Sequence, residues 1–393
     1  MNSGKKSIVI VSALRTAVGT FNGSLHNMQS FELGSIVVKE IVKKTKLKPY
    51  DVDELIMGQV LTGAAGQNPA RQAAIHAGIP KDKTAYIVNQ VCGSGLRSVV
   101  AGYQSIISSD SNIVIAGGQE SMTNAPHAIN FRKEKKLDET KLIDTMIKDG
   151  LWDSFNGYHM GVTAENVATK WKISRKDQDD FALSSQVKAQ KAQKDGKFKN
   201  EIVPIVLKTK NKFEIDEHPR AEMTIDKLTK LKPSFKKNGT VTAGNASGIN
   251  DGAAAVVLMT EEEANKRNLE PLGRIISWAT CGVDPSLMGS GPIPASKKAL
   301  EKASWKINDL DLIESNEAFA AQSLAVIKDL KIPKEKVNVN GGAIALGHPI
   351  GASGTRVLVT LLHEMNRRDS KKGLATLCIG GGMGIAMCVE RDF

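Results

Sequence analysis

A cysteine and a histidine in glycine-rich turns have the clearest potential for chemistry. Cys92 lies in the turn 91–96, between a predicted strand and a predicted helix. Such an elbow presents its side chain at the carboxyl edge of a sheet, where α/β proteins place their sites. The positive end of the helix is expected to lower the pKa of the thiol and favour a nucleophilic thiolate. A small, inert core cysteine is the structural alternative.

His348 lies in a comparable turn, 347–354, which also precedes a predicted helix. Proline and glycine neighbours place this histidine in a loop rather than on an apolar helix face. If it faces Cys92, a neutral imidazole can act as the general base that activates the thiol. An isolated surface histidine is the alternative.

Two further positions follow predicted strands. Cys378 ends an apolar strand before the glycines 380–382, whose backbone N–H groups are free to bind a ligand oxygen. Taken alone, Cys378 is better explained as a packing residue of that strand. Asn316 can donate a hydrogen bond or orient a water molecule, but asparagine is also a frequent helix N-cap.

The elements that must position these residues alternate between strand and helix in both halves of the chain. That alternation predicts parallel β-sheets covered by helices, in two similar units that meet at a shared site. In the first half the predicted strands are 8–14, 55–60, 85–89 and 112–116, with helices 31–45 and 96–107. In the second half they are strands 337–340, 373–378 and 384–389, with helices 295–303 and 354–366.

The segment 119–249 breaks this alternation because it is rich in lysine and polar turns. Long excursions in compact folds usually serve as lids or binding loops. A strand at 253–259 then returns to the first sheet. We therefore expect a first half at 1–118, an inserted loop domain at 119–249, a return at 250–271 and a second half at 272–393.

Composition narrows the class of protein. The net charge of +11 arises from 53 basic and 42 acidic residues, but no basic run with interleaved aromatics or nucleic-acid motif accompanies it. A polyanionic small substrate and a solvated lysine-rich surface are the better explanations. Four scattered cysteines match no zinc or disulfide pattern, and no apolar run is long enough to cross a membrane. We expect a cytoplasmic enzyme without a metal, a nucleic-acid partner or a membrane partner.

Five motifs, in order and covering nearly the whole chain, resemble those of the thiolase family. They occupy residues 88–96, 239–254, 316–320, 340–354 and 378–382. The resemblance implies five layers, αβαβα, from two similar α/β halves with an inserted loop domain. It also implies a homo-oligomer, either a dimer or a homotetramer. Coenzyme A is expected to act as a substrate, with no permanently bound cofactor.

The resemblance assigns a role to each candidate residue. His348 would deprotonate Cys92, which would carry the acyl group, and Cys378 would move the α-proton. His348 and a water held by Asn316 would stabilise an enolate, while the N–H groups of Cys92 and Gly380 would stabilise the tetrahedral oxyanion. The implied coenzyme A contacts are Leu151, His159, Met160, Arg220, Ala243, Ser247, Met288 and Phe319.

The region around Met288 resembles acetyl-specific members, in which this methionine narrows the acyl pocket. We therefore expect an acetyl-CoA C-acetyltransferase, which condenses two acetyl-CoA molecules or runs in reverse. A broad-range 3-oxoacyl-CoA thiolase of fatty-acid oxidation is the nearest alternative. A decarboxylating condensing enzyme would lack Cys378, and a non-catalytic relative would lack Cys92 or His348; both cysteines and the histidine are present.

Overall fold

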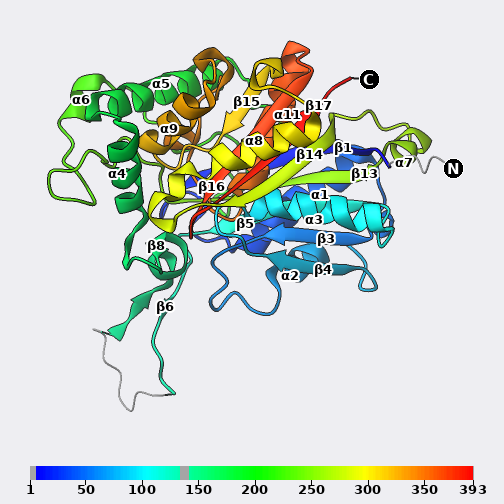
Figure 1. Cartoon of the computed structure of the whole chain (residues 1–393). Coiled ribbons are helices and arrows are strands. Elements are labelled where there is room, and N and C mark those ends of the chain that lie inside the picture. The colour runs from blue at the N-terminus through cyan, green and yellow to red at the C-terminus, as the bar shows by residue number, and fades with distance from the viewer. Residues whose placement is uncertain (1–5, 133–140, 393) are drawn as a thin grey trace.

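Two groups of strands form the framework of the computed structural model, which describes residues 6–132 and 141–392 (Figure 1). The first group has the order β1–β13–β5–β3–β4 and the second β14–β17–β16–β15. Strands β1 and β14 connect the groups through two residue pairs, Val9–Arg274 and Ile10–Gly273. The strands are β1 (Ile8–Thr16), β3 (Glu54–Gly58), β4 (Thr84–Val88), β5 (Val114–Ser121), β13 (Asn250–Thr260), β14 (Gly273–Gly282), β15 (Leu312–Ser315), β16 (Lys372–Ile379) and β17 (Met383–Glu390).

The central strands are buried along almost their entire length. Every residue of β1 and β5 is buried, as are the first ten residues of β13. The sequences of such strands are nearly continuous apolar runs, because helices cover both faces of the sheet. Strands β3, β4 and β5 pair in parallel, whereas β13 is antiparallel to both of its long neighbours.

Helices form the remaining three layers. Helices α1 (Ser30–Thr45) and α2 (Pro69–His76) cover the outer face of the first strand group, and α8 (Pro292–Ala303) and α9 (Ala320–Leu330) cover that of the second. Helices α3 (Ser94–Ser108) and α11 (Ser353–Arg368) lie between the two groups and share one core. This arrangement confirms the predicted five-layer thiolase-like fold.

Helices α3 and α11 cross at their N-termini through two glycines. A Cβ atom at Gly354 would lie 2.2 Å from the backbone nitrogen of Leu96, and one at Gly95 would lie 2.8 Å from that of Thr355. Any larger residue would push the helices apart. Because each helix begins next to a candidate residue of its own half, this close approach brings Cys92 and His348 to the same site.

The predicted strands and helices of both halves are present within a few residues of their expected bounds, with one exception. Residues 337–340 do not form a strand. Val337 makes only an isolated parallel bridge to Ile313, and Asn338 then adopts a φ of 44°. A left-handed residue cannot continue an extended strand, so the pairing ends after one residue.

The segment 119–249 contains more helix than the sequence indicates. Helices α4 (Met160–Trp171), α5 (Arg175–Lys194) and α6 (Ile225–Thr229) gather at one end of the molecule (Figure 1). The hairpin of β6 (His127–Ala128) and β7 (Ile143–Asp144) projects away from the body. The other described elements of the segment are short: a π-helical turn (Met146–Leu151) and the strands β8 (Trp152–Asp153), β9 (Tyr158–His159), β10 (Ile202–Val203), β11 (Ile205–Val206) and β12 (Lys212–Phe213). Among the described residues, none of the helices has the length and apolar character to cross a membrane.

Candidate active site

The turn before α3 holds Cys92 in a strained elbow. Val91, immediately before it, adopts a φ of 45°, a left-handed conformation that costs a β-branched residue about 1–3 kcal/mol. Two side chains hold this geometry. The backbone N–H of Val91 donates to Oδ1 of Asn89 at 3.0 Å, and the hydroxyl of Ser94 donates to the carbonyl of Val91 at 2.6 Å. The strand-to-helix elbow predicted around Cys92 is therefore present.

The loop before α11 holds His348 in a buried position. Gly347 has a φ of 103°, and a Cβ atom there would lie 2.5 Å from Cγ of Asn250. Asn250 accepts a hydrogen bond from the backbone N–H of His348 at 2.9 Å. The imidazole Nδ1 lies 2.6 Å from the hydroxyl of Ser353. The amide nitrogen of Asn316 lies 3.4 Å from both ring nitrogens.

A cavity of about 740 Å³ joins the two loops. Cys92, His348, Cys378 and Gly380 all line it, while Asn316 is completely buried behind His348. The eight positions predicted to contact coenzyme A also line this cavity: Leu151, His159, Met160, Arg220, Ala243, Ser247, Met288 and Phe319. The residues singled out from the sequence therefore lie around one cavity in the folded protein.

Burial sets the protonation states at the centre of the site. It raises the pKa of the Cys92 thiol to about 11, although the backbone N–H of Gly380 hydrogen-bonds the sulfur and opposes this shift. Burial, with a smaller contribution from the positive charge of Arg356, lowers the pKa of His348 to about 3. The expectation that the helix N-terminus would lower the pKa of Cys92 is therefore wrong, because desolvation outweighs the helix dipole. The free enzyme holds a thiol and a neutral imidazole.

Cys378 is completely buried within the same apolar cluster as Met160, Met288 and Phe319. Burial raises the pKa of its thiol well above the usual range, and the proximity of Cys92 raises it further. A thiol in this environment keeps its proton until a stronger base or a reacting carbanion takes it. Such a group suits proton donation to a carbanion better than direct nucleophilic attack.

Glu120 connects the loop after β3 to the loop that holds His348. Its carboxylate accepts the backbone N–H groups of Val60 and Leu61 in the first half and of Gly351 in the second, at 2.9–3.2 Å. Burial nevertheless raises the pKa of Glu120 to about 7. Glu120 was not predictable as a site residue, because a glutamate within a strand carries no motif that reveals its partners.

One wall of the cavity is aromatic. The ring of Phe235 stacks on His159 with centroids 4.6 Å apart, and its edge meets Phe319 at 6.2 Å. Nδ1 of His159 accepts the backbone N–H of Gly161 at 3.0 Å, so the neutral ring presents Nε2–H on its other side. Phe235 was missed because it stands alone in a lysine-rich stretch, and His218, which also lines the cavity, was missed for a similar reason.

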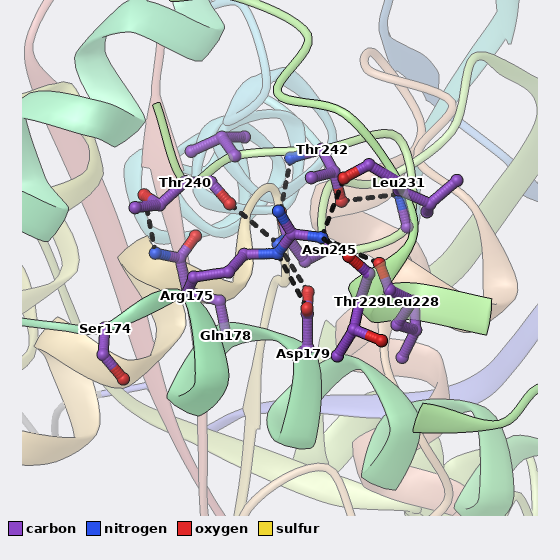
Figure 2. Close-up of polar contacts among 12 residues, drawn as sticks. Ser174, Arg175, Gln178, Asp179, Leu228, Thr229, Leu231, Thr240, Thr242 and Asn245 are labelled. Atoms are coloured by element: carbon purple, nitrogen blue, oxygen red, sulfur yellow. Dashed lines mark hydrogen bonds and ion pairs between the residues drawn. The ribbon is translucent and has the colours of Figure 1, made fainter. Parts of the chain in front are cut away.

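Helix α5 anchors the cavity-lining segment that contains Ala243 and Ser247 (Figure 2). The amide of Asn245 donates to Asp179 at 2.9 Å, and Asp179 also pairs with Arg175 at 2.7 Å. Arg175 in turn donates to the carbonyls of Leu228 and Leu231. This buried network holds the 240–247 segment against the rest of the site. Among the described residues, no group of three or more His, Cys, Asp or Glu side chains could hold a metal ion.

Comparison with known proteins identifies the family. The model of the thiolase N-terminal domain matches residues 8–262, and that of the thiolase C-terminal domain matches residues 269–391. The acetyl-CoA acetyltransferase of Rhizobium meliloti is 60% identical over 98% of this chain and 99% of its own length. The cytosolic acetyl-CoA acetyltransferase of the mouse is 53% identical and is covered completely, as is this chain.

Solved structures agree. The acetyl-CoA acetyltransferase of Bacillus anthracis superposes with a TM-score of 0.96 at 44% identity, over 99% of this chain and 100% of that one. Human mitochondrial 3-ketoacyl-CoA thiolase in complex with CoA gives a TM-score of 0.95 at 43% identity, over 98% of both chains. With both domain models covering nearly its whole length, the chain belongs to the thiolase family.

Proposed function

We propose that this enzyme is an acetyl-CoA C-acetyltransferase that condenses two acetyl-CoA molecules to acetoacetyl-CoA and CoA, and catalyses the reverse thiolysis. The observation that carries the proposal is the single cavity in which Cys92, His348 and Cys378 face a pocket that the buried Met288 narrows. Relatives at 60% identity bear the name acetyl-CoA acetyltransferase, which supports this function.

In thiolysis His348 takes the proton of Cys92, and the sulfur attacks the C3 carbonyl of acetoacetyl-CoA. The N–H groups of Cys92 and Gly380 donate to the oxyanion, in keeping with the hydrogen bond from Gly380 to the Cys92 sulfur. The C2–C3 bond breaks, and the carbanion takes the proton of Cys378 to become acetyl-CoA. CoA then gives its thiol proton to Cys378 and attacks acetyl-Cys92, whose departing sulfur recovers the proton from His348.

The carbanion needs its own stabilisation before it is protonated. Asn316 suits the proposed role of holding a water beside His348, because its buried Oδ1 has no hydrogen-bond partner among the described residues. Imidazolium at His348 can donate to the same enolate oxygen. Two separate sets of donors thus serve the two oxyanions of the reaction.

Coenzyme A, a polyanionic substrate, fits the aromatic cavity and its exposed rim. Leu151, Met160 and Phe319 offer apolar contacts to pantetheine, and His159 offers an N–H donor. Arg220 is exposed, and its backbone is fixed to α5 through Gln186 and Gln190. A guanidinium on this exposed rim suits the nucleotide phosphates, because its planar donors match phosphate oxygens. We propose these side chains, with Ala243, Ser247 and Met288, as the substrate-binding set.

Chain length separates the proposed activity from that of a broad-range 3-oxoacyl-CoA thiolase. The test is thiolysis of acetoacetyl-CoA beside a medium-chain 3-oxoacyl-CoA, with wild type and the Cys92→Ala variant. We expect turnover of acetoacetyl-CoA that disappears in the variant, with little medium-chain activity. Similar rates with both substrates would move the enzyme to the broad-range class, whose human mitochondrial member has the same fold.

A homo-oligomer is proposed from the exposed apolar surface. Phe131 and Ile143, near the projecting β6–β7 hairpin, are 53% and 49% exposed. Strand β4 is the last strand in the described order, and its Tyr86 is 38% exposed. Open strand edges and apolar patches of this kind are common interaction surfaces. Light scattering after gel filtration is expected to give a dimer or tetramer; a monomer would contradict the proposal.

We also propose the division into a first half (1–118 with 250–271), a loop domain (119–249) and a second half (272–393). The helical anchor at α5 supports the treatment of 119–249 as one unit. A cytoplasmic location is proposed from the family and from the four free cysteines among the described residues. Fractionation of cells that express the tagged chain tests that location.

A further inference from the structure

Helices α3 and α11 begin with equivalent serines. Ser94 is followed by Gly-Leu-Arg and Ser353 by Gly-Thr-Arg, and each serine is the first residue of its helix. Both hydroxyls donate to a carbonyl of the preceding turn: Ser94 to Val91 at 2.6 Å and Ser353 to Pro349 at 2.9 Å. Each hydroxyl also has a second partner, and that partner differs between the halves.

In the first half the second partner is backbone, whereas in the second it is the imidazole of His348. Oγ of Ser94 accepts the backbone N–H of Gln90 at 2.8 Å. Oγ of Ser353 lies 2.6 Å from Nδ1 of His348. We infer that Ser353 is a positioning residue that holds the neutral imidazole of His348 in the tautomer with the proton on Nδ1. This inference rests on the proposed role of His348 as the general base.

The direction of the hydrogen bond follows from a count of protons. A serine hydroxyl has a single proton, and the hydrogen bond between Ser353 and the carbonyl of Pro349 uses it, because a carbonyl oxygen can only accept. The oxygen can then only accept from His348, so Nδ1 carries the ring proton. Ser353 and His348 are 0% and 5% exposed, and no solvent competes for this bond.

Asn316 favours the same tautomer. Its amide nitrogen, a donor, lies 3.4 Å from both imidazole nitrogens. If Nδ1 carries the proton, Nε2 has the lone pair that can accept from this amide. In the opposite tautomer Nε2–H would face the amide N–H groups, and the lone pair of Nδ1 would face a lone pair of the Ser353 oxygen. Both neighbours therefore favour a lone pair on Nε2.

This tautomer gives the ring the nitrogen that the reaction needs. A lone pair on Nε2 can take the proton of Cys92, and the resulting Nε2–H can then donate to the enolate oxygen. Throughout these steps Nδ1–H stays on Ser353, so the ring does not need to turn. Without an acceptor for Nδ1–H, the two tautomers would compete, and only one of them can act as a base.

The test is the tautomer itself, observed by NMR of enzyme labelled with ¹⁵N-histidine. The chain has seven histidines, so the His348 signals are assigned by their loss in the His348→Asn variant. We expect Nδ1 to be protonated in the wild type at neutral pH. In Ser353→Ala the population is expected to shift toward Nε2–H, and kcat for acetoacetyl-CoA thiolysis is expected to fall about 10- to 100-fold with little change in KM.

Ser98→Ala is the matched control. Ser98 is a completely buried serine of α3 whose hydroxyl binds only backbone carbonyls, of Gly95 and Gly117. It is expected to leave the tautomer and kcat unchanged. Ser353→Thr restores the hydroxyl and is expected to recover the Nδ1–H form, which separates loss of the hydrogen bond from loss of packing.

Two results would overturn the inference. One is a wild-type His348 with its proton on Nε2, a measurement that depends on no serine variant. The other is a folded Ser353→Ala enzyme with an unchanged tautomer and unchanged kcat. Full turnover by His348→Asn would instead refute the proposed role of His348 as base, and it would leave the tautomer measurement standing.

Discussion

The two halves of the molecule use one local design to hold two different catalytic groups. In each half a residue with positive φ precedes the catalytic side chain: Val91 before Cys92, and Gly347 before His348. In each half a serine at the start of the central helix closes the turn. In the first half the serine hydroxyl binds only groups of the backbone, and it thereby fixes the N–H groups of the elbow. In the second half the serine hydroxyl also binds the imidazole of His348, and it thereby fixes the orientation of the ring.

The arginines three residues after these serines, Arg97 and Arg356, also differ in their surroundings. Arg97 is partly exposed and lies over the ring of Trp278, 5.3 Å from its centroid. Arg356 is buried, 3.8 Å from Glu314, and its charge helps to lower the pKa of His348. Burial of the imidazole itself, aided by this positive charge, lowers the pKa of His348 and keeps the ring neutral, as a base must be. The repeat therefore supplies a scaffold, and single side chains decide which role each half performs.

Removal of the base should give the largest effect. Since positioned general bases contribute about 10²–10⁴-fold, His348→Ala is expected to lower kcat/KM by that factor. The rate at which iodoacetamide alkylates Cys92 at neutral pH should fall as well, because the thiol is no longer deprotonated by its neighbour. Thermal unfolding serves as the control for folding. Unchanged alkylation and turnover would show that His348 of the second half does not act as the base for Cys92 of the first half.

The two positive-φ residues should differ in how much stability a substitution costs. Gly347→Ala places a Cβ atom 2.5 Å from Asn250 at a φ of 103°, and is expected to cost about 3 kcal/mol or more of stability. Val91→Gly relieves strain but loses packing against Gly380, and is expected to change stability by at most about 1 kcal/mol. Urea unfolding measures both. Equal losses would argue that the two turns are under similar constraint.

Glu120, which binds backbone from both halves, should make stability depend on pH. Its pKa is raised from 4.5 to about 7 in the folded state, so its contribution is complete below pH 4.5 and is lost as the pH rises to about 7. Glu120→Gln cannot titrate. Its stability relative to wild type should therefore improve by on the order of 3 kcal/mol between pH 4.5 and 7. Urea midpoints measure this, with Glu335→Gln at an exposed site as control; a constant difference would contradict the assignment.

Met288, supplied by the second half, should have the smallest effect, on specificity. It is 3% exposed and packs with Met160, Phe319 and Cys378. Met288→Ala is expected to raise the ratio of medium-chain to acetoacetyl-CoA activity about tenfold, because a few methylene groups of space are worth about 1–3 kcal/mol. The kcat/KM values for both substrates provide the ratio. No change would show that another wall limits the acyl chain.

Much of the framework was predictable from the sequence because each half alternates buried apolar strands with amphipathic helices. Cys92 and His348 were predictable for a related reason, since glycine-rich turns mark the places where such strands meet helices. The long helix α5 was not. The apolar residues that it buries fully are all alanines, Ala182, Ala189 and Ala192, and its other buried residues are polar, so its apolar periodicity is weak.

Properties that depend on three-dimensional burial also escaped prediction. The local sequence of Cys92 suggests a lowered thiol pKa, but the surrounding apolar cluster of Val60, Met122 and Ile350 raises it. Phe235 and Glu120 contribute to the site through partners distant in the chain. The hydrogen bond between Ser353 and His348 spans only five residues, yet the tautomer that it favours depends also on Asn316, which is distant in the sequence.

The central claim is that the first half carries the acyl group and the second half does the proton chemistry. It is tested most directly with Cys378→Ala, which should accept an acetyl group from acetyl-CoA but should not condense it. Incubation with acetyl-CoA followed by peptide mass mapping is expected to show one acetyl group, on Cys92. Absence of acetylation, or acetylation at another residue, would contradict the account.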